Sequence, residues 1–69
     1  MQRHHVRSSV LRSVGYDEDA RTLEIEFASG SIYRYFEVPP VVFVGLMAAE
    51  SLGEYFSHHI RDEYPYERE

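Results

Sequence analysis

The stretch from Ser31 to Pro40 most constrains the fold, because a short aromatic strand runs there directly into a pair of prolines. Tyr33 and Tyr35 alternate with their neighbours as side chains do along a β-strand, and aromatic residues favour a pleated surface. Pro39 and Pro40 lack a backbone donor and therefore end the strand, but proline is well tolerated in the first turn of a helix. This stretch predicts a strand followed at once by a helix that begins at Pro39 or Pro40.

The segment before this strand shows the clearest alternation in the chain. From Thr22 to Phe27, apolar residues alternate with threonine and glutamate, which is the pattern of a strand with one buried and one solvated face. A three-residue loop, Ala28 to Gly30, then closes a hairpin, with the glycine in the left-handed region. This loop pairs Ile25 with Tyr33 and turns both central tyrosines toward the core.

A shorter loop is the alternative for this hairpin. If only Ser29 and Gly30 formed the turn, the two tyrosines would lie beside the glutamates on the solvated face. The three-residue loop is favoured because it places Glu24 opposite Arg34, and opposite charges stabilise a cross-strand pair. We therefore expect the tyrosines to face inward, with only their hydroxyl groups near water.

Ser8 to Tyr16 is predicted to form the first strand, but the sequence leaves its inward face open. If the turn after it has five residues, Leu11 faces inward and Arg12 lies opposite Glu26. If that turn has four residues, Val14 and Tyr16 face inward instead, because a shift of one residue exchanges the two faces of a strand.

Val41 to Glu50 has the apolar spacing of a helix. One stripe consists of Val42, Leu46 and Ala49. The opposite side is also apolar, at Val41, Val44 and Ala48. A helix that is apolar all round is usually buried all round, and a chain this small offers little to cover it. We therefore expect a homo-oligomer that associates through Val41, Val44 and Ala48.

The residues after this helix predict a second one. Ser51 and Glu54 form a capping box, and Leu52, Phe56 and Ile60 recur at helical spacing. A proline ends the helix at or before residue 64. Residues 1–7 are expected to be a mobile arm and residues 65–69 a frayed tail. The predicted fold is a single α+β domain, residues 1–69, in which a three-stranded antiparallel β-meander is followed by two α-helices packed on one face.

Composition limits the classes of function. A chain of 69 residues without cysteine has neither disulfides nor a thiolate zinc site, so oligomerisation is a common route to stability. The net charge of −5 argues against general affinity for nucleic acid or anionic membranes. All seven basic residues are arginine, which suits phosphate, but genomic base composition is the simpler explanation of this usage. No segment is long and apolar enough to span a membrane, and the N-terminus lacks the apolar region of a signal peptide. These features predict a cytoplasmic protein.

Catalytic and metal sites are not predicted. No nucleophile has a recognisable base, and the glycines form no phosphate loop, so we expect neither an enzyme nor a cofactor. Glu54, His58 and Asp62 lie one turn apart on the second helix, a spacing that suits a metal ligand set. Two carboxylates beside a single histidine are more typical of a solvated helix face.

The order and spacing of several short motifs resemble the KTSC domain, a family named for its occurrence at the C-terminus of some lysyl-tRNA synthetases. The motifs are Gly15-Tyr16-Asp17, Leu23-x-Ile25-x-Phe27-x-x-Gly30-x-x-Tyr33-x-Tyr35-x-x-Val38-Pro39, Val42-Phe43-x-x-Leu46-x-x-Ala49-x-Ser51-x-Gly53-x-Tyr55-Phe56 and Ile60-Arg61-x-x-Tyr64. The resemblance covers residues 6–66. The chain departs from it at Ser57, where members often carry asparagine, and at Val44, where they often carry a charged residue.

The resemblance implies a small non-catalytic binding module, because RNA binding has been suggested for the family and no catalytic residues are assigned. Its partner would be RNA or a tRNA-associated protein. The candidate binding residues are Tyr33, Arg34, Tyr35, Arg12 and Arg61. Aromatic rings on a sheet can stack on bases and arginines can contact phosphates, but inward tyrosines and arginines that balance nearby acidic residues are the simpler interpretation. The alternative function, favoured by the net charge, is a self-associating protein–protein module with no nucleic-acid role.

Overall fold

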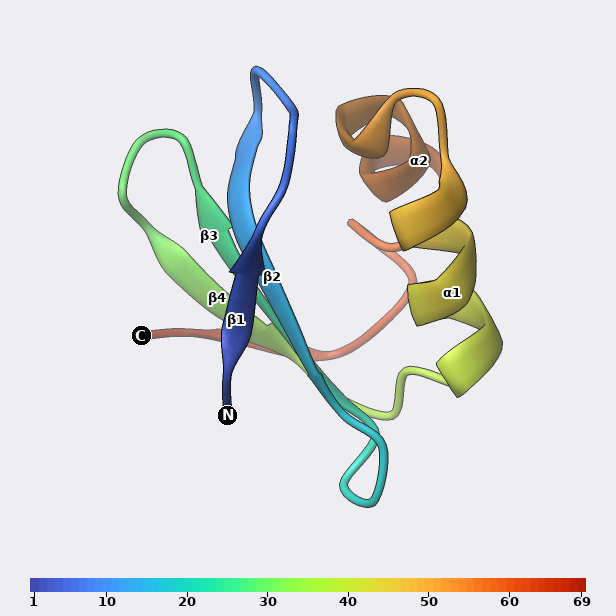
Figure 1. Ribbon diagram of the computed structural model, residues 1–69. Helices are drawn as coiled ribbons and strands as arrows, with labels where there is room; N and C mark the ends of the chain where they lie inside the picture. The colour runs from blue at the N-terminus through green and yellow to red at the C-terminus, as the bar shows by residue number, and fades with distance from the viewer.

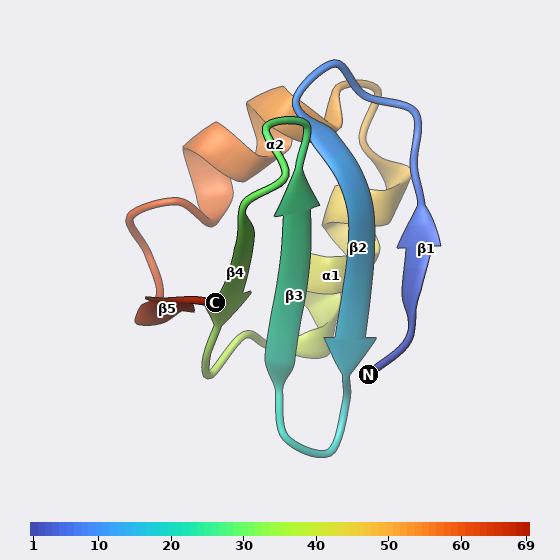
Figure 2. The same ribbon diagram turned by 90° about the vertical axis from the view of Figure 1, so that its left-hand side faces the viewer.

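The computed structural model describes residues 1–69, and its centre is a single antiparallel sheet of five strands whose spatial order follows the chain. The strands are β1 (Arg3–His5), β2 (Leu11–Asp17), β3 (Thr22–Phe27), β4 (Ile32–Tyr35) and β5 (Tyr66–Arg68). The helices are α1 (Pro40–Ala48) and α2 (Leu52–His59). Both helices lie on the same face of the sheet, and the other face has no layer over it (Figures 1 and 2). The prediction of an α+β domain with two helices on one face is confirmed.

The prediction of a three-stranded meander is wrong, because both ends of the chain add a strand. In the segment expected to be a mobile arm, Arg3 pairs with Gly15 of β2. In the segment expected to be a frayed tail, Tyr66 pairs with Tyr35 of β4. Both strands are only three residues long and lie at the sheet edges (Figure 2). They satisfy backbone groups that the outer strands of the meander would otherwise leave unpaired.

A β-bulge resolves the two alternatives for the first strand. The turn has four residues, because Asp17 pairs with Thr22, and Val14 accordingly faces the core. The register then shifts by one residue between Leu11 and Ser13, which brings Leu11 to the same face. The bulge thus buries apolar residues that no regular strand could place on one face.

The hairpin of β3 and β4 has the predicted three-residue loop. Ile25 pairs with Tyr33, and Glu24 lies opposite Arg34. Gly30 closes the loop with a φ of 96°, a conformation that glycine adopts without strain. The predicted register is confirmed, and it directs the tyrosines toward the helices.

The helices begin where the sequence predicts. Pro39 is the N-cap of α1 and Pro40 is its first residue, while the Ser51 hydroxyl accepts a hydrogen bond of 3.2 Å from the Glu54 amide at the start of α2. The core between the helices and the sheet contains Leu11, Val14, Leu23, Ile25, Tyr35, Val38, Leu46, Leu52, Phe56 and Ile60. Neither helix has the length and apolar character that crossing a membrane requires.

Candidate binding site

A groove opens on the helix side of the sheet, where α2 and the β3–β4 hairpin diverge. Its volume is about 720 Å³. Its lining includes Val10, Phe27, Tyr33, Tyr35, Phe56, Arg61, Asp62, Tyr66 and the hydroxyl-bearing residues Ser9, Ser29, Ser31 and Ser57. We call this surface the aromatic groove. It combines flat apolar rings with hydroxyl groups, and ligand sites typically have such a lining.

The rings of the aromatic groove form one continuous cluster. Tyr33 lies 5.5 Å from Phe27, edge to face, and 5.7 Å from Tyr66, measured between ring centroids. Phe56 of α2 packs against Phe27 at 5.2 Å and against Tyr35 at 5.6 Å. Edge-to-face and tilted contacts at these distances are favourable and hold each ring in place. The groove therefore has a rigid aromatic floor.

Tyr35 is the most enclosed of these tyrosines, and only 4% of it is exposed. Burial raises the pKa of its phenol to about 12. A tyrosine hydroxyl is already protonated at physiological pH, and burial extends to higher pH the range over which Tyr35 can donate a hydrogen bond.

Two arginines lie beside these rings. Arg61 lies just beyond α2 and is exposed, and its side chain makes no ion pair within the chain. The neighbouring Asp62 is the one acidic residue that lines the groove. The guanidinium of Arg68 lies 6.0 Å from the centroid of Tyr33, a cation–π contact, and donates a 3.2 Å hydrogen bond to the Ser31 hydroxyl. This end of an otherwise acidic protein can therefore accept an anionic group.

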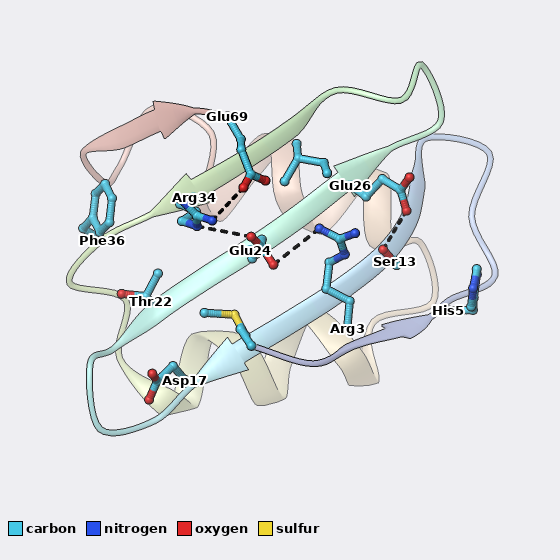
Figure 3. A pocket seen from close by; sticks show the side chains of 12 residues that line it. Arg3, His5, Ser13, Asp17, Thr22, Glu24, Glu26, Arg34, Phe36 and Glu69 are labelled. Carbon is cyan, nitrogen blue, oxygen red and sulfur yellow. Dashed lines mark hydrogen bonds and ion pairs between the residues drawn. The ribbon is translucent and has the colours of Figure 1, made fainter.

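The outer face of the sheet carries a second hollow, of about 780 Å³, which is lined by a network of charged side chains (Figure 3). Glu24 lies at its centre, where its carboxylate contacts Arg34 Nε at 3.2 Å and Arg3 Nη1 at 3.4 Å. Arg34 also contacts Glu69 at 2.8 Å and Glu67 at 3.9 Å. The network joins β3 to β1 and β5, and its arginines are already neutralised by carboxylates.

Arg12, at the bulge in β2, is likewise paired with a carboxylate on the outer face. Its guanidinium contacts Glu26 at 3.4 Å and donates a hydrogen bond of 2.9 Å to the Ala28 carbonyl oxygen. The Ser13 hydroxyl donates to the same glutamate at 2.9 Å, and this hydrogen bond, together with Arg12, lowers the pKa of Glu26. Arg12 stabilises the sheet in this arrangement, and its charge is matched by a neighbouring acid.

The structure separates the five candidate binding residues into two groups. Tyr33, Tyr35 and Arg61 come together in the aromatic groove. Arg34 and Arg12 lie on the outer face in ion pairs, so they do not form one surface with the tyrosines.

The candidate residues predicted from the sequence did not include Tyr66, which lines the groove, or Arg68, which lies over the Tyr33 ring, because their segment was expected to be frayed. The one sequence signal for a strand here was that Tyr66 and Arg68 alternate with Glu67, which would place the first two on one face. Three residues are too few for a strand prediction.

The outer side of α1 is exposed as a separate apolar surface. Val41 is 73% and Val44 is 61% exposed, and Ala48 continues the same line along the helix. The terminal segments do not cover these residues, because they pair with the sheet edges instead. We call Val41, Val44 and Ala48 the α1 face. The structure contains no group of three or more His, Asp or Glu side chains arranged to hold a metal ion.

Comparison with known proteins identifies relatives along nearly the whole chain. Residues 7–64 match the KTSC domain family. The chain is 45% identical to an uncharacterised protein from Stutzerimonas stutzeri over 64 residues, which is 93% of this chain and 90% of that protein. The crystal structure of a KTSC domain protein from Yersinia pestis superposes with a TM-score of 0.96 at 37% identity, covering 99% of this chain and 96% of the other.

A second type of relative is much longer. The chain is 42% identical to a lysine–tRNA ligase from Nostoc punctiforme over 60 residues, which is 87% of this chain but 11% of the ligase. Ligases from Nostoc sp. and Trichormus variabilis match over the same share of their length, at 42% and 40% identity. The same domain thus occurs both as a small protein and as a minor part of a tRNA ligase.

Proposed function

The chain belongs to the KTSC domain family, and from this premise we propose that it is a small non-catalytic binding module that contacts RNA through the aromatic groove. The observation that carries the proposal is the combination of the exposed Tyr66 ring and the half-buried Tyr33 ring with Arg61 and Arg68 at one end of an acidic protein. Aromatic side chains that stack on unpaired bases, beside arginines that contact phosphates, are the common means of single-stranded RNA recognition.

The relatives support this choice of partner. A domain that forms 11% of a lysine–tRNA ligase is covalently attached to a protein whose name includes tRNA as a substrate. The net charge of −5 does not oppose a local contact, because much of the acidic charge lies on the outer face of the sheet, away from the groove. Four glutamates there form ion pairs with Arg3, Arg12 and Arg34. A single groove with few phosphate contacts is expected to bind weakly and with a shallow dependence on salt.

Titration of ¹⁵N-labelled protein with bulk tRNA at low salt tests the proposal. We expect the amide signals of Tyr33, Arg61 and Tyr66 to shift, and signals of the outer face to stay in place. Arg61→Gln should weaken the shifts, whereas Arg21→Gln, which removes the same charge from an exposed turn far from the groove, should not. If no amide signal moves at low salt, where electrostatic attraction is strongest, the RNA proposal is excluded.

A second candidate function is self-association without a nucleic-acid role. The exposure of Val41 and Val44 favours it, because apolar side chains in one contiguous patch commonly mark a contact surface. The α1 face lies on another element than the aromatic groove, so the two functions are independent of each other. The oligomeric state of the protein tests self-association, and the tRNA titration separately tests whether the protein has a nucleic-acid role.

A further inference from the structure

The Tyr35 hydroxyl is the most informative polar group in the aromatic groove. Tyr35 is 4% exposed, yet its hydroxyl makes no hydrogen bond within the chain. Every fully buried side-chain oxygen and nitrogen in the structure has a hydrogen-bond partner. The unpartnered Tyr35 hydroxyl oxygen is therefore not fully buried, and we place it at the groove that Tyr35 lines. Tyr16 provides the contrast, since its hydroxyl donates a 2.6 Å hydrogen bond to the Val38 carbonyl oxygen. A polar group of this kind on an aromatic floor selects a ligand that offers a hydrogen-bonding edge.

Tyr66 supplies a flat surface next to this hydroxyl. Its ring centroid lies 5.7 Å from those of both Tyr33 and Tyr35, and 60% of the residue is exposed. The rings of Tyr33 and Tyr35 are 6.3 Å apart and nearly parallel, which leaves no space for a third ring between them. A planar ligand would therefore stack on the open face of Tyr66.

The position of the charges indicates where an anionic group would lie. Arg61 lines the same groove and has no carboxylate partner, whereas Asp62 beside it limits the number of negative charges that the site can accept. The groove, at about 720 Å³, lies within the usual range for small-ligand sites and is large enough for one nucleotide.

Taking RNA binding as the premise, we propose that the aromatic groove is the subsite for a single unstacked base of a single strand. The base stacks on Tyr66, the edge of the base exchanges a hydrogen bond with the Tyr35 hydroxyl, and the adjoining phosphate contacts Arg61. This arrangement assigns stacking, edge recognition and charge to three residues. It predicts that the protein prefers single strands, because a base inside a duplex cannot reach the floor of the groove.

Binding of single-stranded RNA hexamers and of a matched duplex, measured at low salt, tests the subsite. Loss of base stacking by Tyr66→Leu is expected to weaken hexamer binding by roughly tenfold. Tyr35→Phe keeps the ring and removes only the hydroxyl, so we expect hexamer binding to weaken about three- to tenfold. It should also reduce the preference among homopolymer sequences. Thermal melting of each variant shows whether the fold is retained, and Arg21→Gln is the matched control for Arg61→Gln.

The outcomes separate the subsite from the function on which it rests. If wild type binds no RNA, the proposed function fails and the subsite fails with it. If wild type binds RNA and both tyrosine variants bind equally well, RNA binding stands and the subsite is wrong. If the duplex binds as tightly as the single strand, the proposal that the groove accepts an unstacked base is likewise wrong.

Discussion

Arg34 and Tyr35 are neighbours in β4 with opposite environments. Arg34 lies on the outer face between Glu24 and Glu69, whereas Tyr35 is buried under α2 against Phe56. Successive side chains of a strand point to opposite faces, so one residue contributes to the charge network and the next to the groove. At the scale of single residues, the site therefore depends on the register of one hairpin.

Truncation of Tyr35 tests whether the floor of the groove is also core. Because the ring is almost fully buried, we expect Tyr35→Ala to lower the free energy of unfolding by about 3 kcal/mol, or to prevent folding. Tyr66→Ala is the matched comparison, and its cost should be well under half of that, since most of Tyr66 is already exposed. Chemical denaturation of both variants gives the two values. A Tyr35→Ala protein as stable as wild type would contradict the burial of this ring.

The edge strands β1 and β5 are the elements that complete the sheet. Each has three residues, and side chains of the outer-face network reach both of them, Arg3 in β1 and Glu67 in β5. Short strands bury little apolar area, so their stability depends on backbone pairing and on this network. β5 also carries Tyr66, and its pairing with β4 therefore determines whether the aromatic groove is complete.

Gly15→Ala tests the pairing of β1. A Cβ atom at residue 15 would lie 2.7 Å from the Gln2 carbonyl oxygen and 3.0 Å from Arg3 Cγ. Since one of these atoms belongs to the backbone, β1 must move, and we expect a loss of about 1–3 kcal/mol of stability. Hydrogen exchange should show loss of protection in β1 but not in β4. Arg3→Ala is the comparison, because it removes the contact with Glu24 and leaves the backbone pairing in place. Unchanged protection in Gly15→Ala would contradict the close approach.

At the scale of the whole molecule, charge is distributed unevenly. The net charge is −5, but residues 38–49, which include α1, carry no charged side chain. If two copies associate, as we propose, the α1 face is the part of the surface where they would meet with the least electrostatic repulsion. An interface on one short helix is smaller than the roughly 800 Å² per partner of stable complexes, so association at micromolar concentrations is the expectation.

Sedimentation of wild type and Val44→Glu at tens of micromolar tests self-association. Two-fold symmetry would place the new carboxylate twice in the same interface, so the variant should dissociate and stay folded. Ala20→Glu, which adds the same charge in an exposed turn, should sediment as wild type does. A wild type that is monomeric over this range would exclude assembly through α1.

Local patterns in the sequence determined the central part of this protein. Alternation in β3, the glycine of the loop and the Glu24–Arg34 pair specify the register of the hairpin, and Pro40 and Ser51 specify the helix starts. Each of these features involves residues close together in the chain or one short loop, where sterics and turn chemistry leave few alternatives. The inward position of the tyrosines follows from that register, and with it two of the residues that line the groove.

Only the tertiary structure decided the edges of the sheet and the composition of the groove. The pairing of Tyr66 with Tyr35 and of Arg3 with Gly15 consists of backbone hydrogen bonds between distant segments, which need no side-chain pattern. The bulge near Leu11 arises because burying every apolar residue of β2 outweighs the loss of regular pairing. These features depend on what the rest of the fold leaves unpaired or exposed, and such a balance is set by the assembled chain rather than by any local stretch of it.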